Sequence, residues 1–379
     1  MMRIGVVSTS KIPSTTANSI QVMKVCQAYK QLGYETNLFV PGFNKADWSI
    51  LSKFYGIKTP FKITFIPTIK ILKRYDFFII VGFLMALQKF QIIHTWLPQI
   101  AHISGFLKIP FLLELHELPT GKFGPSLLKK LFSSKHRKRF LPISKALKNL
   151  YENNFRFHFD QNEVRIAPDG VDLERYKNLQ NENNLREQLG VINSFLAVYT
   201  GHLYKGRGMD LLIKLAENLP MVIFLWVGGR EEDVSYWKDF IEHKKLNNVL
   251  ITGFIDNEYI PLYQSIGDVL LMPYENQVSG SSGGNTAEFC SPMKMFEYMA
   301  TGKPIISSNL PVIHEILNDS NAIFCDYEDV DQWIDAIQKI LDDPNVGIKL
   351  GKQAKNDAQK YSWIERAKTS IDGFINDYR

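Results

Sequence analysis

The stretch RIGVVSTSKIPSTTANSIQVMKVCQAYKQLGYETNLFV, residues 3–40, decides the fold. It opens with a continuous apolar run at 4–7, which predicts a buried strand. After a polar loop, apolar residues recur with helical spacing from about residue 18 to residue 33, and the segment 35–40 predicts a second strand. A helix that connects two buried strands indicates a parallel sheet.

The alternation of strands and helices continues and then restarts. Residues 90–96 and 110–117 predict further strands of the first half. Polar residues dominate 170–190, which places a domain boundary there. We therefore expect an α/β protein with two Rossmann-like parallel-sheet domains, at 1–172 and 173–361. The second domain is predicted to have a helix at 208–220 and strands at 195–201, 221–229, 248–254, 268–274, 304–308 and 321–326.

Length and composition fit this organisation. A chain of 379 residues suggests two domains, and 45% hydrophobic with 22% charged residues is typical of a globular protein. The first apolar run is too short for a signal peptide. Cys26, Cys290 and Cys325 are scattered and show no zinc or redox spacing. We therefore expect a cytoplasmic protein, with peripheral contact to the inner face of the membrane as a further possibility.

Two histidines follow predicted strands of the first half. In such sheets ligands bind at the carboxyl ends of the strands, and with two domains we expect the site in the cleft between them. His94 and His116 each end a predicted strand, so both are candidates for that site. A lone histidine is more often structural, and the spacing leaves both alternatives open.

The segment SPMKMFEYMATGKPII, residues 291–306, predicts a helix and a strand with charged residues among the apolar ones. Ser291 would cap the helix and Pro292 would occupy its first position. A helix N-terminus suits a phosphate, and Glu297 one turn deeper would accept hydrogen bonds from the vicinal hydroxyls of a ribose. The alternative is a surface pair between Lys294 and Glu297, worth a few tenths of a kcal/mol.

A glycine-rich turn, GHLYKGRGMD at 201–210, lies between a predicted strand and a predicted helix. Lys205 and Arg207 in this turn could clamp a diphosphate. The turn matches neither a dinucleotide fingerprint nor a P-loop, so a solvated basic loop is an equal alternative.

Basic residues flank two apolar segments. The run at 77–87 is too short for a membrane span and predicts a buried helix, but Lys70, Lys73, Arg74 and Lys89 flank it. Residues 126–140 interleave leucines with lysines and arginines, and the net charge is +5. This pattern suits an anionic membrane surface. No nucleic-acid-binding motif occurs, so we expect no nucleic-acid partner.

With these motifs in hand, the chain resembles the retaining glycosyltransferases of family 4, which have the GT-B fold of two Rossmann-like domains. The resemblance extends over nearly the whole chain. It is carried in order by LPISKALKNL, VRIAPDGVDLERY (similar to the family's pNGVD segment), YTGHLYKGRGMDLL, ITGFIDNEYIPLYQSIGDVLLMPY and SPMKMFEYMATGKPIISSNLP. The closing residues 362–379 resemble the helix that crosses back to the first domain.

The resemblance implies roles for the residues singled out. Glu297 would bind the donor ribose, and the helix start would meet the donor phosphates together with the diphosphate segment. Arg207, Lys205 and His116 would serve catalysis. The donor-binding set would be Ser291, Pro292, Met293, Lys294, Glu297, Gly201, His202, Ile255 and Glu288, and the acceptor side would include Asn18, Ser19 and His94.

Three departures from the family pattern are visible. Phe289, rather than glutamate, precedes Glu297 by eight positions, and Glu288 is its neighbour. The family's arginine after the glycine of the diphosphate segment is His202 here. The first loop has no Gly-Gly pair and reads STTANS instead.

We therefore predict a retaining hexosyltransferase that moves a sugar from a nucleoside diphosphate, UDP before GDP, to a hydroxyl of a glycan or lipid-linked acceptor. The alternatives are another GT-B enzyme, such as a nucleotide-sugar epimerase or a phosphorylase, and a catalytically inactive binding subunit. No cofactor and no metal are expected. The D-x-D at Asp329 and Asp331 begins a predicted helix, where acidic residues are favoured by the dipole.

Overall fold

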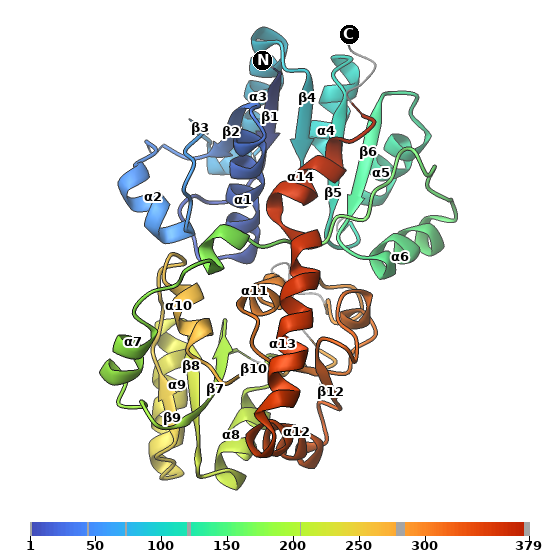
Figure 1. The fold of residues 1–379 in the computed structure, drawn as a ribbon. Coiled ribbons are helices and arrows are strands. Elements are labelled where there is room, and N and C mark those ends of the chain that lie inside the picture. Colours follow the sequence, from blue (N-terminus) through green and yellow to red (C-terminus); the bar gives the residue numbers. More distant parts are fainter. Residues whose placement is uncertain are drawn as a thin grey trace. The chain divides into compact units, whose positions relative to one another are not determined.

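The computed structural model describes residues 2–43, 45–72, 74–119, 123–204, 206–277 and 285–374. The chain divides into two compact units (Figure 1). The first comprises Met1–Asp169 and Trp363–Arg379, and the second Gly170–Ser362. These divisions fall within three residues of the predicted ones at 172/173 and 361/362.

The first unit is built on a six-stranded parallel sheet in the order β3-β2-β1-β4-β5-β6. In its centre Val6 of β1 lies in register with Leu38 of β2 on one side and with His94 of β4 on the other. The strands are β1 (Arg3–Val7), β2 (Glu35–Pro41), β3 (Lys62–Ile66), β4 (Ile92–Thr95), β5 (Phe111–Leu115) and β6 (Lys138–Pro142).

Helices flank this sheet. The predicted first helix is confirmed: Thr16 Oγ1 accepts a hydrogen bond from the Ser19 N–H, and helix α1 ends before Gly33, whose φ of 87° is left-handed. The helices of this unit are α1 (Ala17–Gln31), α2 (Trp48–Tyr55), η1 (Lys70–Leu72), α3 (Tyr75–Gln88), α4 (Pro98–Phe106), α5 (Gly124–Ser133), α6 (Lys145–Phe155) and α14 (Trp363–Ile371).

The second unit repeats the topology of the first. Its parallel sheet has the order β12-β11-β10-β7-β8-β9, so its first strand again lies beside its fourth. Each predicted strand of this half is confirmed. The strands are β7 (Phe195–Thr200), β8 (Val222–Val227), β9 (Val249–Ile251), β10 (Val269–Met272), β11 (Ile305–Ser308) and β12 (Ile323–Cys325).

The core of the second unit forms where helices cover this sheet. Trp226 of β8 and Trp333 of α12 are fully buried in it. The helices are η2 (Leu173–Tyr176), α7 (Glu182–Gln188), α8 (Met209–Asn218), α9 (Glu231–His243), α10 (Ile260–Ser265), α11 (Met293–Thr301), η3 (Ile313–Glu315), α12 (Val330–Asp342), α13 (Pro344–Ala358) and η4 (Gln359–Tyr361).

Two predictions about apolar segments are wrong. The helix α3 is not buried as a whole, because one side of it is exposed to solvent. The segment 126–140 was predicted to present its leucines to a membrane. Leu128 and Leu131 are buried, and the ring of Phe132 stacks on that of Phe157 with centroids 4.1 Å apart. Leu128 and Leu131 therefore belong to the core and are unavailable to a membrane.

Candidate functional site

Both sheets have a topological switch point, where the strand order reverses, and the candidate residues gather at the carboxyl ends of the strands around these points. In the first unit the switch lies between β1 and β4, and in the second between β7 and β10. In open parallel sheets a ligand binds in the crevice at this place. Each unit therefore carries its own cluster.

In the second unit, close packing shapes the turn that follows β7. Gly208 has a φ of 75°, and a Cβ there would lie 2.0 Å from the Pro273 carbonyl oxygen, just after β10. Gly201 has a φ of 143°, and a Cβ there would lie 2.9 Å from Lys294 Nζ. Glycine at both positions lets the turn cross the end of β10 and lets the lysine reach the backbone.

Lys294 points into this turn from the first turn of α11. Its Nζ lies 3.8 Å from the ring centroid of Tyr199 and 5.2 Å from that of Tyr274. Burial lowers the pKa of the Lys294 ammonium well below its usual range, Arg207 lowers it further, and Glu297 opposes this. Lys294 and Glu297 are both described and form no ion pair, so the structure does not contain the surface pair of the alternative interpretation.

Arg207 is the second cation of the cluster. Its Nη2 donates to Tyr204 Oη at 2.7 Å, and its guanidinium lies 5.0 Å and 5.1 Å from the ring centroids of Tyr204 and Tyr274. Its Nε is buried and has no hydrogen-bond partner in the described part of the chain. Arg207 and Lys294 thus share the Tyr274 ring, and neither forms an ion pair with a carboxylate in the described part of the chain, which favours an anionic ligand.

Glu297 lies one turn deeper in α11. Its Oε2 accepts a hydrogen bond from Gln264 Nε2 at 3.1 Å, and Gln264 Oε1 in turn accepts one from Tyr176 at 2.7 Å. Among the described residues nothing hydrogen-bonds to Glu297 Oε1. A positioned carboxylate with an open oxygen can accept bonds from vicinal hydroxyls.

The start of α11 differs from the prediction by one residue. Pro292, with φ −71° and ψ 123°, is the N-cap, and Met293 is the first helical residue. Ser291 is buried and precedes the cap, so its predicted capping role is wrong. The reason is that the proline takes an extended ψ here. Within the described ranges, the backbone N–H groups of Met293 and Lys294 have no protein acceptor, as at other helix starts.

The remaining predicted donor residues fall around this cluster. The His202 ring stacks on Tyr204 at 5.2 Å, and its carbonyl accepts from Tyr199 Oη at 2.6 Å. Ile255 is half-buried in the loop after β9. Glu288 is exposed, whereas Phe289 is 9% exposed and thus fills the position of the family's first glutamate with a buried ring. Lys205 lies outside the described residues.

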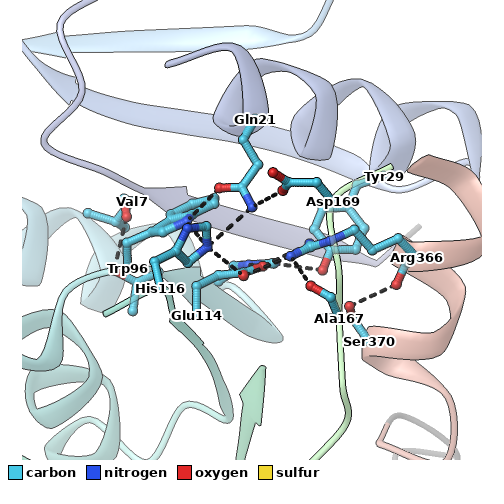
Figure 2. A network of polar contacts seen from close by, with 12 residues as sticks. Val7, Gln21, Tyr29, Trp96, Glu114, His116, Ala167, Asp169, Arg366 and Ser370 are labelled. Atoms are coloured by element: carbon cyan, nitrogen blue, oxygen red, sulfur yellow. Dashed lines mark hydrogen bonds and ion pairs between the residues drawn. The ribbon is translucent and has the colours of Figure 1, made fainter. Parts of the chain in front are cut away.

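In the first unit, Figure 2 shows a buried carboxylate at the centre of a polar network. Glu114 of β5 accepts two hydrogen bonds from the Arg366 guanidinium of α14, both at 2.8 Å. Arg366 also donates to the carbonyls of Ala167 and Pro168 at 3.0 Å and 2.8 Å. Burial would raise the pKa of Glu114, but Arg366 and the hydrogen bonds from His116 and His94 hold it well below its usual range.

His94 lies beneath the site rather than in it. It is fully buried in β4, its Nε2 lies 2.8 Å from Glu114 Oε1, and its Nδ1 lies 2.8 Å from Tyr29 Oη. Burial lowers the pKa of His94, so the ring is neutral: Nε2–H donates to the carboxylate and Nδ1 accepts from the tyrosine. In the structure this histidine positions Glu114. Because it is fully buried, the predicted contact of His94 with the acceptor substrate is disfavoured.

His116 presents the accessible end of the network. Its side chain is 29% exposed, and its Nε2 lies 3.2 Å from Glu114 Oε2. Gln21 Oε1 accepts from the Trp96 indole at 3.0 Å, and Gln21 Nε2 donates to Asp169 Oδ1 at 2.7 Å. The Trp96 indole and Gln21 Nε2 both have closer acceptors than His116 Nε2, so the Nε2–H of His116 donates to Glu114. Its Nδ1 is then an acceptor, and no described residue donates a hydrogen bond to it.

Asn18 and Ser19, predicted for the acceptor side, hold the loop after β1. Ser19 Oγ donates to the carbonyls of Ser14 and Thr16 at 2.6 Å and 2.8 Å, and Ser10 donates to Asn18 Oδ1. Asn18 is half-buried, whereas Ser19 is buried. Both remain predictions as ligand contacts.

The D-x-D has a structural role. Asp329 is the N-cap of α12, accepting from the Gln332 N–H at 3.2 Å and from its Nε2 at 2.8 Å. Asp331 lies in the first turn of that helix. Over the described ranges, no cluster of three or more His, Cys, Asp or Glu residues could hold a metal ion.

Several members of these clusters were not predicted from the sequence: Glu114, Arg366, Gln21, Trp96 and Asp169 in the first unit, and Tyr199, Tyr274 and Gln264 in the second. One signal was present for Glu114, a carboxylate inside the apolar strand FLLEL. Its partner Arg366 lies 252 positions further along the chain, where no local pattern connects the two.

The sequence was compared with those of known proteins. Residues 181–360 match the family model described as Glycosyl transferases group 1. The chain is 26% identical over 271 residues to alpha-galactosylglucosyldiacylglycerol synthase of Streptococcus pneumoniae, covering 69% of this chain and 65% of that protein. It is 22% identical over 225 residues to D-inositol 3-phosphate glycosyltransferase of Xylanimonas cellulosilytica, covering 56% and 51%. The matches thus span less than two thirds of either relative.

Among solved structures, the fold is similar to that of HepE of Anabaena in complex with UDP-glucose. The TM-score is 0.75 at 16% identity, and the match covers 99% of this chain and all (100%) of the other. Two parallel sheets with flanking helices, each with the same switched strand order, are the GT-B fold. Together these similarities show the fold, GT-B, and a likeness in sequence to named glycosyltransferases.

Proposed function

We propose that the chain is a retaining hexosyltransferase that moves a sugar from a nucleoside diphosphate, preferably UDP, to a hydroxyl of a glycan or lipid-linked acceptor. One observation carries the proposal. Lys294 and Arg207 converge on Tyr274 at the switch point of the second unit, and Glu297 holds an open carboxylate oxygen one turn deeper in the same helix.

The two cations account for the chemistry expected at the donor. When the bond between sugar and phosphate breaks, negative charge grows on the diphosphate leaving group. Lys294 and Arg207 would stabilise this charge together with the free N–H groups at the start of α11, and Lys205 is proposed to assist them. Glu297 would fix the ribose, so that the reacting bond is held against the cations.

In the first unit, His116 is proposed to contact the transferred sugar. Its Nε2–H donates to Glu114, which leaves Nδ1 as an acceptor for a sugar hydroxyl. Retention fits a reaction on one face of the sugar, in which the leaving phosphate takes the proton of the acceptor. No pair of glycosidase-type carboxylates is required for such a reaction.

Two of the similar proteins support the choice of donor and acceptor. HepE was solved with UDP-glucose, and the pneumococcal relative is named as a synthase of a diacylglycerol glycolipid. We extend these properties to this chain as a proposal: UDP as the nucleotide, a cell-envelope polysaccharide or glycolipid as the product, a cytoplasmic location and contact with an anionic membrane. The buried Phe289 in place of the family's first glutamate favours a second candidate, a catalytically inactive binding subunit.

The test is Glu297→Gln, assayed by calorimetric titration with UDP and with uridine. Loss of a charge-assisted acceptor costs about 1.5–3 kcal/mol, so affinity for both ligands should fall about ten- to a hundred-fold. Glu187→Gln, an exposed glutamate of α7, is the matched control and should bind normally. Unchanged affinity in the Glu297 variant would remove the proposed ribose contact.

Turnover separates the two candidates. The wild-type protein should hydrolyse UDP-sugar slowly without an acceptor, and NMR of the product should show the anomeric configuration of the donor. UDP-sugar binding without any hydrolysis or transfer would favour the inactive subunit. An inverted product would refute retention.

A further inference from the structure

One side of α3 is apolar and uncovered. Ile79, Phe83 and Leu87 are 71%, 65% and 61% exposed, and Ile71 of the preceding η1 is 85% exposed. Tyr75 and Ile80 are exposed beside them. We call these six residues the α3 face. A soluble protein rarely gathers so many large exposed apolar side chains on one element unless they bind something.

The other side of α3 explains why the helix is apolar all round. Phe77, Val81 and Met85 are fully buried. A Cβ at Gly82 would lie 3.0 Å from Cγ2 of Ile103 in α4, so the two helices pack closely at this glycine. On a helical wheel the buried and exposed residues occupy opposite arcs. The core therefore needs only one side, and the α3 face is in excess of what folding requires.

Two cations lie at the ends of the helix that carries the α3 face. Arg74 and Lys89 flank the helix at its two ends, both exposed and in left-handed conformations with φ of 70° and 51°. Beyond the end of α4, the exposed Lys108 follows Phe106, which is itself 85% exposed. The acidic group of α3, Asp76, accepts hydrogen bonds from the backbone N–H groups of Ile69 and Phe77 and so serves the start of the helix.

We propose that the α3 face binds an anionic lipid bilayer, with α3 lying in the plane of the interface. A helix in this position buries its apolar side about 5–10 Å into the headgroup region, while flanking lysines and arginines reach the phosphates. Among the described helices none has the length and hydropathy needed to cross a membrane, so the contact is interfacial. A second copy of this chain suits the face less, because a symmetric pair would bring Arg74 and Lys89 of both copies together.

The position of η1 connects this face with the first-unit site. The segment follows the carboxyl end of β3, and His116 follows the carboxyl end of β5, on the same edge of one sheet. Four strand spacings separate them, or about 20 Å. The inference rests on the proposed function only for its purpose, which is to bring a lipid-linked acceptor to that edge.

The test is co-sedimentation of the full chain with vesicles, either of phosphatidylcholine alone or mixed with phosphatidylglycerol. We expect binding to the anionic vesicles that weakens as salt rises. The double variant Ile79→Gln, Phe83→Gln should bind about ten-fold or more weakly, because two apolar side chains no longer enter the lipid. Replacing Arg74 and Lys89 by Asn, which tolerates the left-handed conformation, should weaken binding about five-fold for each cation removed.

The matched control is Ile348→Gln, a 65% exposed isoleucine on α13 of the second unit, which should bind like the wild type. UDP-sugar hydrolysis in the absence of vesicles should be unchanged in all these variants, so failure of lipid binding and failure of the proposed activity are read separately. Equal binding to both kinds of vesicle, or undiminished binding by the double variant, would overturn the proposal. So would a dimer in analytical ultracentrifugation that the double variant abolishes, since it would assign the face to a second copy.

Discussion

Burial of the Asp169 carboxylate should destabilise the folded protein at neutral pH, and the substitution Asp169→Asn should remove this destabilisation. It lies partly buried at the end of the first unit's network, where Gln21 Nε2 donates to its Oδ1 at 2.7 Å (Figure 2). Burial raises the pKa of Asp169 to about 6, against opposing effects of His116 and Arg366. Asn has the same shape and keeps an oxygen acceptor for Gln21, and the family segment pNGVD has Asn at this position. We therefore expect Asp169→Asn to stabilise the protein at neutral pH.

The magnitude follows from the shift. A rise of about two pKa units corresponds to about 3 kcal/mol. Solvent reaches part of the side chain, so we expect about half of this value, ~1.5 kcal/mol. Because the pKa of Asp169 is raised in the folded state, the folded protein binds more protons than the unfolded one between about pH 4 and pH 6. This carboxyl group's contribution to stability is therefore favourable below that window and is lost as pH rises through it.

Asn does not titrate. The free energy of unfolding of the Asp169→Asn variant should therefore equal that of the wild type at about pH 4, and its excess over the wild type should reach a plateau above about pH 6. The assay is hydrogen exchange of peptides from β5 at increasing urea, which reports the unfolding of the first unit by itself. Asp160→Asn is the matched control, because Asp160 is an exposed residue of the first unit whose Oδ1 accepts from the Asn162 N–H at 2.8 Å; this variant should show no pH-dependent gain in stability. An equal gain in the free energy of unfolding at about pH 4 and at neutral pH, or no gain at neutral pH, would refute the burial argument.

Two further predictions concern the proposed diphosphate clamp and the absence of a metal requirement. Arg207→Ala should lower kcat more than it weakens UDP binding, because the negative charge that Arg207 stabilises grows in the transition state, and Lys205→Ala should do the same less severely. The control is Arg230→Ala, since the Arg230 guanidinium lies 6.0 Å from the Tyr204 ring centroid. Wild-type turnover in both the Arg207 and the Lys205 variant would place the diphosphate clamp elsewhere. Turnover should persist in excess EDTA and in Asp331→Asn, whereas Asp329→Ala should cost about 1 kcal/mol of stability through loss of the α12 cap. Loss of turnover in EDTA that manganese or magnesium restores would contradict the second prediction.

The fold was largely predictable because its information is local. Strands such as β1 and β8 are continuous apolar runs, and α1 follows with helical spacing and a capping residue. The strand β3 was missed for a physical reason. It lies at one edge of its sheet, and Lys62 at its start is exposed, so its five residues lack the continuous apolar pattern of a buried parallel strand.

The candidate site was predictable where one element carries the signal. A carboxylate in the apolar helix α11 drew attention to Glu297 and to Lys294 one turn before it. The structure shows that Lys294 shares the Tyr274 ring with Arg207, a pairing with an aromatic ring that no spacing rule predicts. The same kind of signal was present at Glu114, but its meaning depends on Arg366 and His94. Networks of this kind join strands and helices that are distant in sequence.

The two apolar segments show most clearly what a pattern leaves open. An apolar run indicates that its side chains favour leaving water, but it does not say which surface covers them. Leu128 and Leu131 alternate with lysines, yet they find cover in the first unit's core. The helix α3 has no charged residue between Phe77 and Leu87, yet its neighbours cover one side only. The side that remains, flanked by Arg74 and Lys89, is the part of this sequence whose apolar character folding does not explain, and a lipid surface does.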